Sequence, residues 1–120
     1  MTLLRRQPRK AKRTGRLRCP GHLAFVRSFE CAIPGCTRKP VSAAHIRGGR
    51  ICGTAMKPDD TEVIPLCDFS PDAHHPEQHR IGEDAFAKKY GLDYDKIIAW
   101  LCKESDALRR YLARNRRAAA

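Results

Sequence analysis

The pattern of apolar and polar positions divides the chain into an extended part and a helical part. Two short, largely apolar segments, Pro40 to Ile46 (PVSAAHI) and Val63 to Cys67 (VIPLC), are typical of strands. The stretch between them, Arg47 to Asp60, is rich in glycine, is interrupted by proline and has no period, as expected of a loop. We therefore predict that the two segments pair as an antiparallel hairpin.

Apolar residues return at helical spacing beyond Gly82. Phe86 and Tyr90 are four residues apart, and Asp93 is a suitable cap for the helix that follows. The apolar stripe then continues through Tyr94, Ile97, Ile98, Leu101, Leu108 and Leu112. This spacing predicts helices over 83–115, and we expect the stripe, together with Trp100, to form the main apolar contact with the hairpin.

Two further segments carry local structural signals. The residue before a proline disfavours helical angles whereas proline suits the first helical position, so we expect a helix to begin at Pro76 with His75 as its N-cap. Leu23 to Phe29 (LAFVRSF) is apolar enough for a short helix or strand, and we expect order to begin around His22.

The formal net charge of +11 is concentrated at the two ends of the chain. Residues 109–120 carry five arginines and no acid, and residues 1–18 carry eight basic residues and no acid: Arg5, Arg6, Arg9, Lys10, Lys12, Arg13, Arg16 and Arg18. Such runs bind phosphates with release of counterions, although a solvated tail has the same composition. We expect 1–18 to be a disordered basic arm that binds nucleic acid, followed by one domain over 19–120.

The compartment is inferred from what the sequence lacks. The first thirty residues contain no continuous apolar segment with a cleavage site, and no stretch approaches the length of a membrane span. We therefore expect a cytoplasmic protein with reduced thiols, no membrane partner and no small-molecule substrate.

Three of the six cysteines have the arrangement of a metal site. Cys31 and Cys36 flank a Pro-Gly turn, which lets two thiolates reach one Zn²⁺, and Cys67 offers a third sulfur. His74 is the preferred fourth ligand, although the six residues between it and Cys67 exceed the usual spacing of about three to five. We predict a structural zinc held by these four residues.

The remaining cysteines have other interpretations. Cys19 and Cys52 are the alternatives to His74 as fourth ligand. Cys102 lies inside an apolar helical stripe and is interpreted as a small hydrophobic residue.

Three histidines suggest a second site. His75 and His79 are four residues apart, so on a helix both rings face the same way and can bind one metal ion. His45 lies in the first strand, and we expect its ring to be aimed at the start of the following helix. A neutral imidazole can take a proton from water, so His45 is a candidate general base. Taken singly, His75 and His79 could be ordinary surface histidines, and His45 could be a half-buried imidazole with a structural role. We interpret His22 as structural.

The segments AAHIR, GTAMKPDD, VIPLC and HHPEQH, in this order between about Leu23 and Tyr90, resemble the HNH (ββα-metal, His-Me finger) endonucleases. The similarity is greatest to the small phage-encoded, Ref-like recombination-enhancement nucleases. The resemblance implies an α+β fold in which a zinc-stabilised hairpin and helix form the ββα-metal unit, followed by C-terminal helices. It also implies metal-dependent hydrolysis of phosphodiester bonds in DNA.

The family pattern assigns a role to each matching residue. His45 corresponds to the general base, and His75 and His79 to the ligands of the catalytic divalent ion, for which we expect Mg²⁺ or Mn²⁺, with Zn²⁺ as an alternative. Asp60 stands where the family usually has Asn, orienting the base or bracing the loop, and Asp59 is the alternative. Ala44 departs from the pattern, because many members have a further metal ligand there, so the ion has only two or three protein ligands.

These assignments leave more than one functional hypothesis. The first is an endonuclease acting on DNA, with a recombination protein as a candidate partner that presents the substrate, and with Arg47 and Lys57 as additional contacts to nucleic acid. The second is a non-catalytic, zinc-stabilised nucleic-acid-binding module. A third is a purely structural zinc domain whose helices over 83–115 bind a partner.

Overall fold

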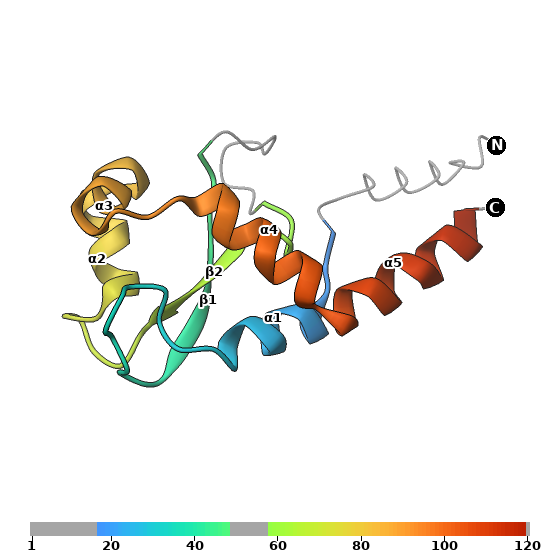
Figure 1. Cartoon of the computed structure of the whole chain (residues 1–120), viewed down its shortest axis with the longest axis horizontal. Coiled ribbons are helices and arrows are strands. Elements are labelled where there is room, and N and C mark those ends of the chain that lie inside the picture. Colours follow the sequence, from blue (N-terminus) through green and yellow to red (C-terminus); the bar gives the residue numbers. More distant parts are fainter. Residues whose placement is uncertain (1–16, 49–57, 120) are drawn as a thin grey trace, which may run out of the picture.

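The computed structural model describes residues 17–48 and 58–119, and within them the chain is an α+β protein with a two-stranded sheet and five helices (Figure 1). The predicted α+β class and the helical C-terminal part are confirmed. The elements are α1 (Pro20–Arg27), β1 (Val41–His45), β2 (Val63–Cys67), α2 (His74–Ile81), α3 (Glu83–Tyr90), α4 (Tyr94–Glu104) and α5 (Asp106–Ala119). Of the N-terminal arm expected over 1–18, residues 1–16 lie outside the described residues.

The predicted hairpin is confirmed with both strands close to their expected limits. β1 and β2 are antiparallel, with Val41 opposite Cys67 and His45 opposite Val63. Every residue of β2 is buried, whereas β1 is mostly half-buried. β2 is therefore the central element on which the helices pack, and β1 places His45 at its end.

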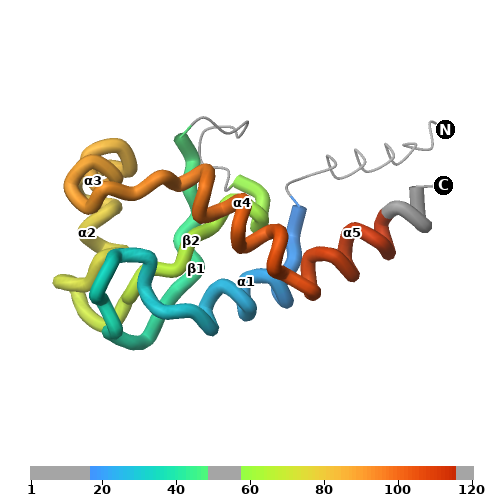
Figure 2. Tube along the Cα trace, viewed as in Figure 1, coloured from blue at the N-terminus to red at the C-terminus, as the bar shows by residue number. Residues whose placement is uncertain are grey.

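The two faces of the hairpin contribute to two apolar clusters. The first contains Ala44, Ile46, Ile64, Leu66, Phe86 and Ile98, and the second contains Val26, Val63 and Leu101 with Ala43 against them. Because successive strand residues point to opposite faces, Ala43 and Ala44 enter different clusters. α1, α2 and α4 all contact the hairpin, with α2 and α3 at one end of the molecule and α5 at the other (Figure 2).

The outer edge of β2 is occupied by the segment that precedes β1. The amide of Ala32 donates a hydrogen bond of 2.8 Å to the carbonyl of Pro65, which points away from β1. Pro65 has no amide hydrogen, so this position of the strand can only accept. The residues around Cys31 are thereby fixed beside the end of β2.

The predicted start of α2 is wrong by two residues. The helix begins at His74 with Ala73 as N-cap, and His75 lies in its first turn. Pro76 also lies in the first turn, where an amide hydrogen has no helical acceptor, so proline costs no hydrogen bond there. The amide of His74 donates instead to the sulfur of Cys67 at 3.3 Å, which fixes the start of the helix.

The segment around Leu23 is helical, and α1 begins slightly earlier than the expected onset of order. Pro20 takes the first turn, where its lack of an amide hydrogen is harmless. Asp93 caps α4 as predicted, accepting a hydrogen bond of 3.2 Å from the amide of Lys96. Capping signals in the sequence were therefore reliable where no tertiary contact competed with them.

The expected role of Trp100 is wrong. Its side chain is 51% exposed and meets the ring of Phe29 edge-on at 5.4 Å, beyond the end of α1, rather than packing on the hairpin. The buried positions of α4 are Ile98 and Leu101. The apolar stripe is thus wider than the surface that the hairpin offers, and Leu112 of α5, 41% exposed, also lies outside the core.

Among the helices of the described ranges, none is both long and apolar enough to cross a lipid bilayer.

Candidate functional site

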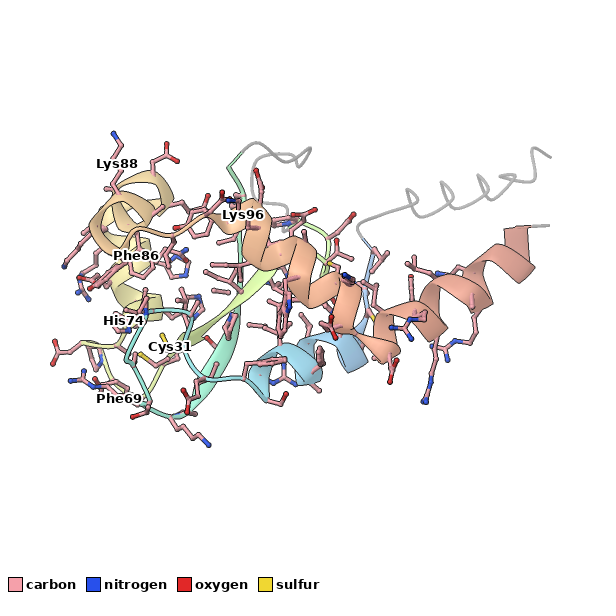
Figure 3. All side chains as sticks on the ribbon, viewed as in Figure 1. Cys31, Phe69, His74, Phe86, Lys88 and Lys96 are labelled. Carbon is pink, nitrogen blue, oxygen red and sulfur yellow. The ribbon has the colours of Figure 1, made fainter. Side chains whose placement is uncertain are left out.

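Four metal-binding side chains converge at the open end of the hairpin. The ligand atoms of Cys31, Cys36, Cys67 and His74 all lie within 4.8 Å of one another. Figure 3 shows Cys31 and His74 pointing toward each other below α2. The predicted convergence of these four residues is confirmed, and the group could hold a metal ion such as zinc.

The distances between these atoms are close to those of a tetrahedral zinc site, with the contact between His74 and Cys67 slightly shorter. The sulfurs of Cys36 and Cys67 are 3.8 Å apart, and Nδ1 of His74 lies 3.4 Å from the sulfur of Cys31 and 3.2 Å from that of Cys67. Sulfur and nitrogen ligands at ordinary zinc bond lengths lie roughly 3.4–3.8 Å from one another at tetrahedral angles. The donor set and its spacing therefore fit zinc.

Local backbone structure brings the ligands together. Gly35 has a φ of 81°, a left-handed conformation suited to glycine, in the turn that separates Cys31 from Cys36. The longer loop between Cys67 and His74 closes on Ser70, whose carbonyl accepts from the amide of Ala73 at 3.0 Å. This closed loop lets His74 reach the group although six residues separate it from Cys67, more than the usual spacing.

The electrostatics of the group suit metal binding coupled to loss of protons. Burial raises the pKa of the Cys31 thiol to about 12, and burial also raises the pKa of Cys67. Burial lowers the pKa of His74, which keeps its imidazole neutral, as a ligand must be. Without a metal the buried thiols hold their protons, and a bound Zn²⁺ stabilises the thiolates and displaces those protons.

The other cysteines lie elsewhere. The sulfur of Cys19 is 3.8 Å from the carbonyl of Ala107, and the sulfur of Cys102 donates to the carbonyl of Thr61 at 3.5 Å. Cys19 is therefore not the fourth member of the group, and Cys52 lies outside the described residues. Cys102 packs against the core, as expected of a small hydrophobic residue.

The His75–His79 pair lies on α2 directly after the last member of this group. Their Nε2 atoms are 3.2 Å apart. Two imidazole nitrogens bound to one cation lie roughly 2.8–3.4 Å apart, given metal–nitrogen bonds of about 2.0–2.1 Å. A shared ion would require this spacing, which is also that of a hydrogen bond between the two rings.

The other ring nitrogen of His75 is held by the hairpin. Its Nδ1 lies 2.7 Å from the hydroxyl of Ser42 and 3.4 Å from a carboxylate oxygen of Asp68. Acceptors at Nδ1 favour a proton on that nitrogen and leave the lone pair on Nε2. Burial and the neighbouring charge of His79 lower the pKa of His75, while Asp68 raises it.

His45 is held by a buried carboxylate. Its Nε2 lies 3.0 Å from Oδ1 of Asp60, whose side chain is 3% exposed. The second oxygen of Asp60 accepts from the amide of Cys19 at 2.9 Å, while Asp59 accepts from the amide of Leu17 at 2.8 Å. It is thus Asp60, rather than Asp59, that contacts the histidine.

The two histidine sites lie on different sides of β1. Ser42, which contacts His75, and His45 are three positions apart, so the alternation of the strand directs them to opposite faces. His45 is the last residue of the strand, and its charge contributes to lowering the pKa of His75. Within the described residues the ring of His45 contacts Asp60 rather than the start of α2, at which it was expected to be aimed.

The residues expected to contact nucleic acid are mostly outside the described ranges. Arg18 and Arg47 are exposed, whereas Arg5, Arg6, Arg9, Lys10, Lys12, Arg13, Arg16 and Lys57 lie outside these ranges. Sequence reasoning missed Glu83, whose two carboxylate oxygens accept from the amides of Arg47 and Gly48 at 2.8 Å each. It also missed Ser42 and Asp68, since nothing in their local sequence connects them to a histidine on a later helix.

No model of a protein family matches the chain, and comparisons with curated proteins and with solved structures give no match. The functional argument therefore depends on the geometry of the site.

Proposed function

We propose that this protein is a metal-dependent endonuclease of the HNH (ββα-metal) type that hydrolyses phosphodiester bonds in DNA. The observation that carries the proposal is the pair of Nε2 atoms of His75 and His79, 3.2 Å apart and adjoining the hairpin that carries His45. The group of three cysteines and His74 supports it. A metal bound there would join the end of β2 to the start of α2 and so hold the histidine pair against the hairpin.

His75 and His79 are the residues that would hold the catalytic divalent cation, Mg²⁺ or Mn²⁺, or else Zn²⁺. A divalent cation at this position supplies neutralisation of the negative charge that develops on the phosphate. Ser42 and Asp68 keep the proton of His75 on Nδ1, so that Nε2 can bind the ion.

His45 is the proposed general base. Because a carboxylate only accepts hydrogen bonds, Asp60 keeps the proton of His45 on Nε2 and leaves the lone pair of Nδ1 for a water molecule. Nδ1 removes a proton from that water, the resulting hydroxide attacks phosphorus, and the bond to the leaving oxygen breaks. The leaving oxygen then takes up a proton from solvent, and the imidazolium of His45 releases its proton to solvent.

A second function is favoured by two observations. Ala44, at the position where a third metal ligand would lie, is fully buried and offers none. His45 points to the face of β1 opposite Ser42, away from the contact that holds His75. Both observations favour a non-catalytic, zinc-stabilised nucleic-acid-binding module, in which the histidine pair has no hydrolytic role.

Nicking of supercoiled plasmid DNA by the full chain separates the two functions. Under the endonuclease proposal, Mg²⁺ or Mn²⁺ supports nicking, and His45→Ala and His79→Ala each lower its rate by about 100-fold or more. Zinc content, helical circular dichroism and DNA binding should remain as in the parent protein, and Lys88→Ala on the exposed face of α3 is the matched control. Binding without nicking in any divalent metal would establish the second function instead.

A further inference from the structure

α5 extends beyond the body of the protein after its first turn. That turn is anchored, because Leu108 is 4% exposed and Ala107 lies against Gly21 so closely that an added Cβ there would meet it at 2.9 Å. The helix then continues away from the hairpin past the start of α1 (Figure 1). Between Arg109 and Asn115 every residue except the half-buried Tyr111 is exposed.

The arginine positions of α5 form two rows along the helix. Successive residues of an α-helix are rotated by about 100°. Arg110, Arg114 and Arg117 therefore fall on one row, and Arg109 and Arg116 fall on a second row about 100° away from it. The only acidic residue of the helix, Asp106, lies in its first turn, where it pairs with Arg109 at 3.0 Å.

A small residue separates the two rows. The helical position of Ala113 lies between them, and its side chain is exposed. Asn115 is also exposed but lies on roughly the opposite side of the helix from Ala113, since two residues correspond to about 200° of rotation. The basic side of α5 thus has arginine positions at its margins. Along its centre lie Asp106 in the first turn and the methyl group of Ala113 about two turns further on.

We propose that α5 lies in the major groove of B-form DNA, with its two arginine rows against the two flanking phosphate strands and Ala113 toward the floor of the groove. This inference rests on DNA being the substrate, as in the proposed function. The major groove, about 12 Å wide, admits one α-helix. Arginines on both margins complement the negative charge on both sides, and a small central residue allows close approach to the base edges.

Other occupants fit the helix less well. The deep, narrow major groove of A-form RNA excludes an α-helix. On an anionic membrane the arginines would meet the headgroups and the opposite side of the helix would insert. That side carries Leu108, Tyr111 and Leu112, but Leu108 is buried against the body of the protein and Tyr111 is half-buried, so only Leu112 among them is exposed. The charge pattern therefore favours duplex DNA.

The decisive experiment compares two substitutions that add the same charge to opposite sides of the same helix. In the full chain, Ala113→Glu should weaken binding to a 30-base-pair duplex by about tenfold or more, because the carboxylate faces the groove, whereas Asn115→Glu should change it less than about threefold. Binding is measured without divalent cations, so that cleavage does not enter, and circular dichroism checks that both variants keep their helix content.

A second variant tests the pairing of the arginines with phosphates. Arg110→Gln, Arg114→Gln and Arg117→Gln combined should reduce the slope of log affinity against log salt by about 0.9 for each phosphate that the helix no longer neutralises. The control removes the same charge from exposed positions on other helices, namely Arg27→Gln, Lys88→Gln and Lys96→Gln, and should change the slope less.

Several outcomes would overturn the inference. Equal losses for Ala113→Glu and Asn115→Glu would mean that only net charge matters, and an absence of duplex binding by the parent protein would remove the helix as a DNA-binding element. A larger loss for Asn115→Glu, with binding to anionic vesicles, would assign α5 to a membrane surface. Nicking that persists while both variants bind alike would refute the role of α5 and leave the proposed nuclease standing. Failure of the parent protein to nick DNA, together with the expected difference between Ala113→Glu and Asn115→Glu, would refute the nuclease and leave the role of α5 standing.

Discussion

The imidazole of His45 and the carboxylate of Asp60, fifteen residues apart in the sequence, are joined by a contact of 3.0 Å between Nε2 and Oδ1. The other oxygen of Asp60 accepts from the amide of Cys19, ahead of α1. One buried carboxylate therefore connects the end of β1, the approach to β2 and the start of α1. The tautomer of His45 and the position of the N-terminal segment depend on the same side chain.

Replacing Asp60 by Asn should lower the nicking rate by about 10- to 100-fold under single-turnover conditions, because an amide can present a donor to Nε2 and so shift the proton of His45 to Nδ1. The amide keeps one oxygen that can accept from Cys19, so the fold should persist.

Asp59→Asn is the matched control for this change. Asp59 also accepts a backbone hydrogen bond, from Leu17 at 2.8 Å, but His45 contacts Asp60 instead. Equal rates for the two variants would show that Asp60 braces the loop and does not position His45.

Removal of one sulfur from the Cys3His group should abolish zinc binding. Cys67→Ala is expected to bind less than about 0.2 zinc per chain, against about one for the parent protein, and to lower the melting temperature by more than about 10 °C. Zinc is measured by elemental analysis and melting by circular dichroism. Cys102→Ala is the control, because Cys102 lies outside the group. Full zinc content in Cys67→Ala would refute the assignment.

Ser42→Ala should weaken the binding of Mn²⁺ to the histidine pair by about 10- to 100-fold, since this change removes the hydroxyl that holds Nδ1 of His75. Free Mn²⁺ is measured by electron paramagnetic resonance on protein whose zinc content is intact. Ser42→Thr should restore most of the affinity because it keeps the hydroxyl. Ser70→Ala, in the loop before α2, should bind Mn²⁺ as the parent does. If Ser42→Ala binds equally well, the serine has no part in orienting the ligand.

Stability should decrease in mild acid because of His22. Its ring is completely buried, Nδ1 lies 2.8 Å from the hydroxyl of Ser105, and Nε2 has no hydrogen-bond partner among the described residues. Burial lowers its pKa, an effect that the negative charge of Asp60 partly offsets. Above pH 6.5 the ring is neutral in both states, whereas below it the unfolded chain binds a proton that the folded chain rejects.

The contribution of His22 is therefore present above pH 6.5 and is lost as the pH falls from there toward the lowered pKa of the folded state. The loss can reach about 1.4 kcal/mol per pH unit. Urea unfolding of the parent and of His22→Leu between pH 7 and pH 5 measures the difference. Parallel pH profiles for the two proteins would assign the acid sensitivity to other groups.

The parts of the fold that could be predicted from sequence are those fixed by local patterns. The limits of the strand Val63 to Cys67 followed from its apolar composition, and the cap at Asp93 from its side chain. The spacing of Cys31, Cys36 and Cys67 indicated the metal group, because few arrangements other than a shared ion bring three thiols within reach.

The remaining features depend on tertiary contacts that local patterns do not encode. The start of α2 follows from a hydrogen bond between His74 and Cys67, which the Pro76 signal could not reveal. The exposure of Trp100 reflects how little surface a two-stranded hairpin offers to α4. The side of β1 on which His45 lies follows from the register of the pair, and a sequence gives the alternation of a strand without saying which face the later helix will cover.

The hydrogen bond between Ala32 and Pro65 has a consequence for the solubility of the chain. An uncovered strand edge recruits strands from other molecules and so seeds aggregation. Here Ala32, directly after Cys31, covers that edge, and Pro65 has no amide hydrogen to offer an incoming chain. A metal bound by Cys31 and Cys67 would hold this segment against β2. Chelation of that metal should therefore expose the strand edge to other chains, as well as lowering the stability of the fold.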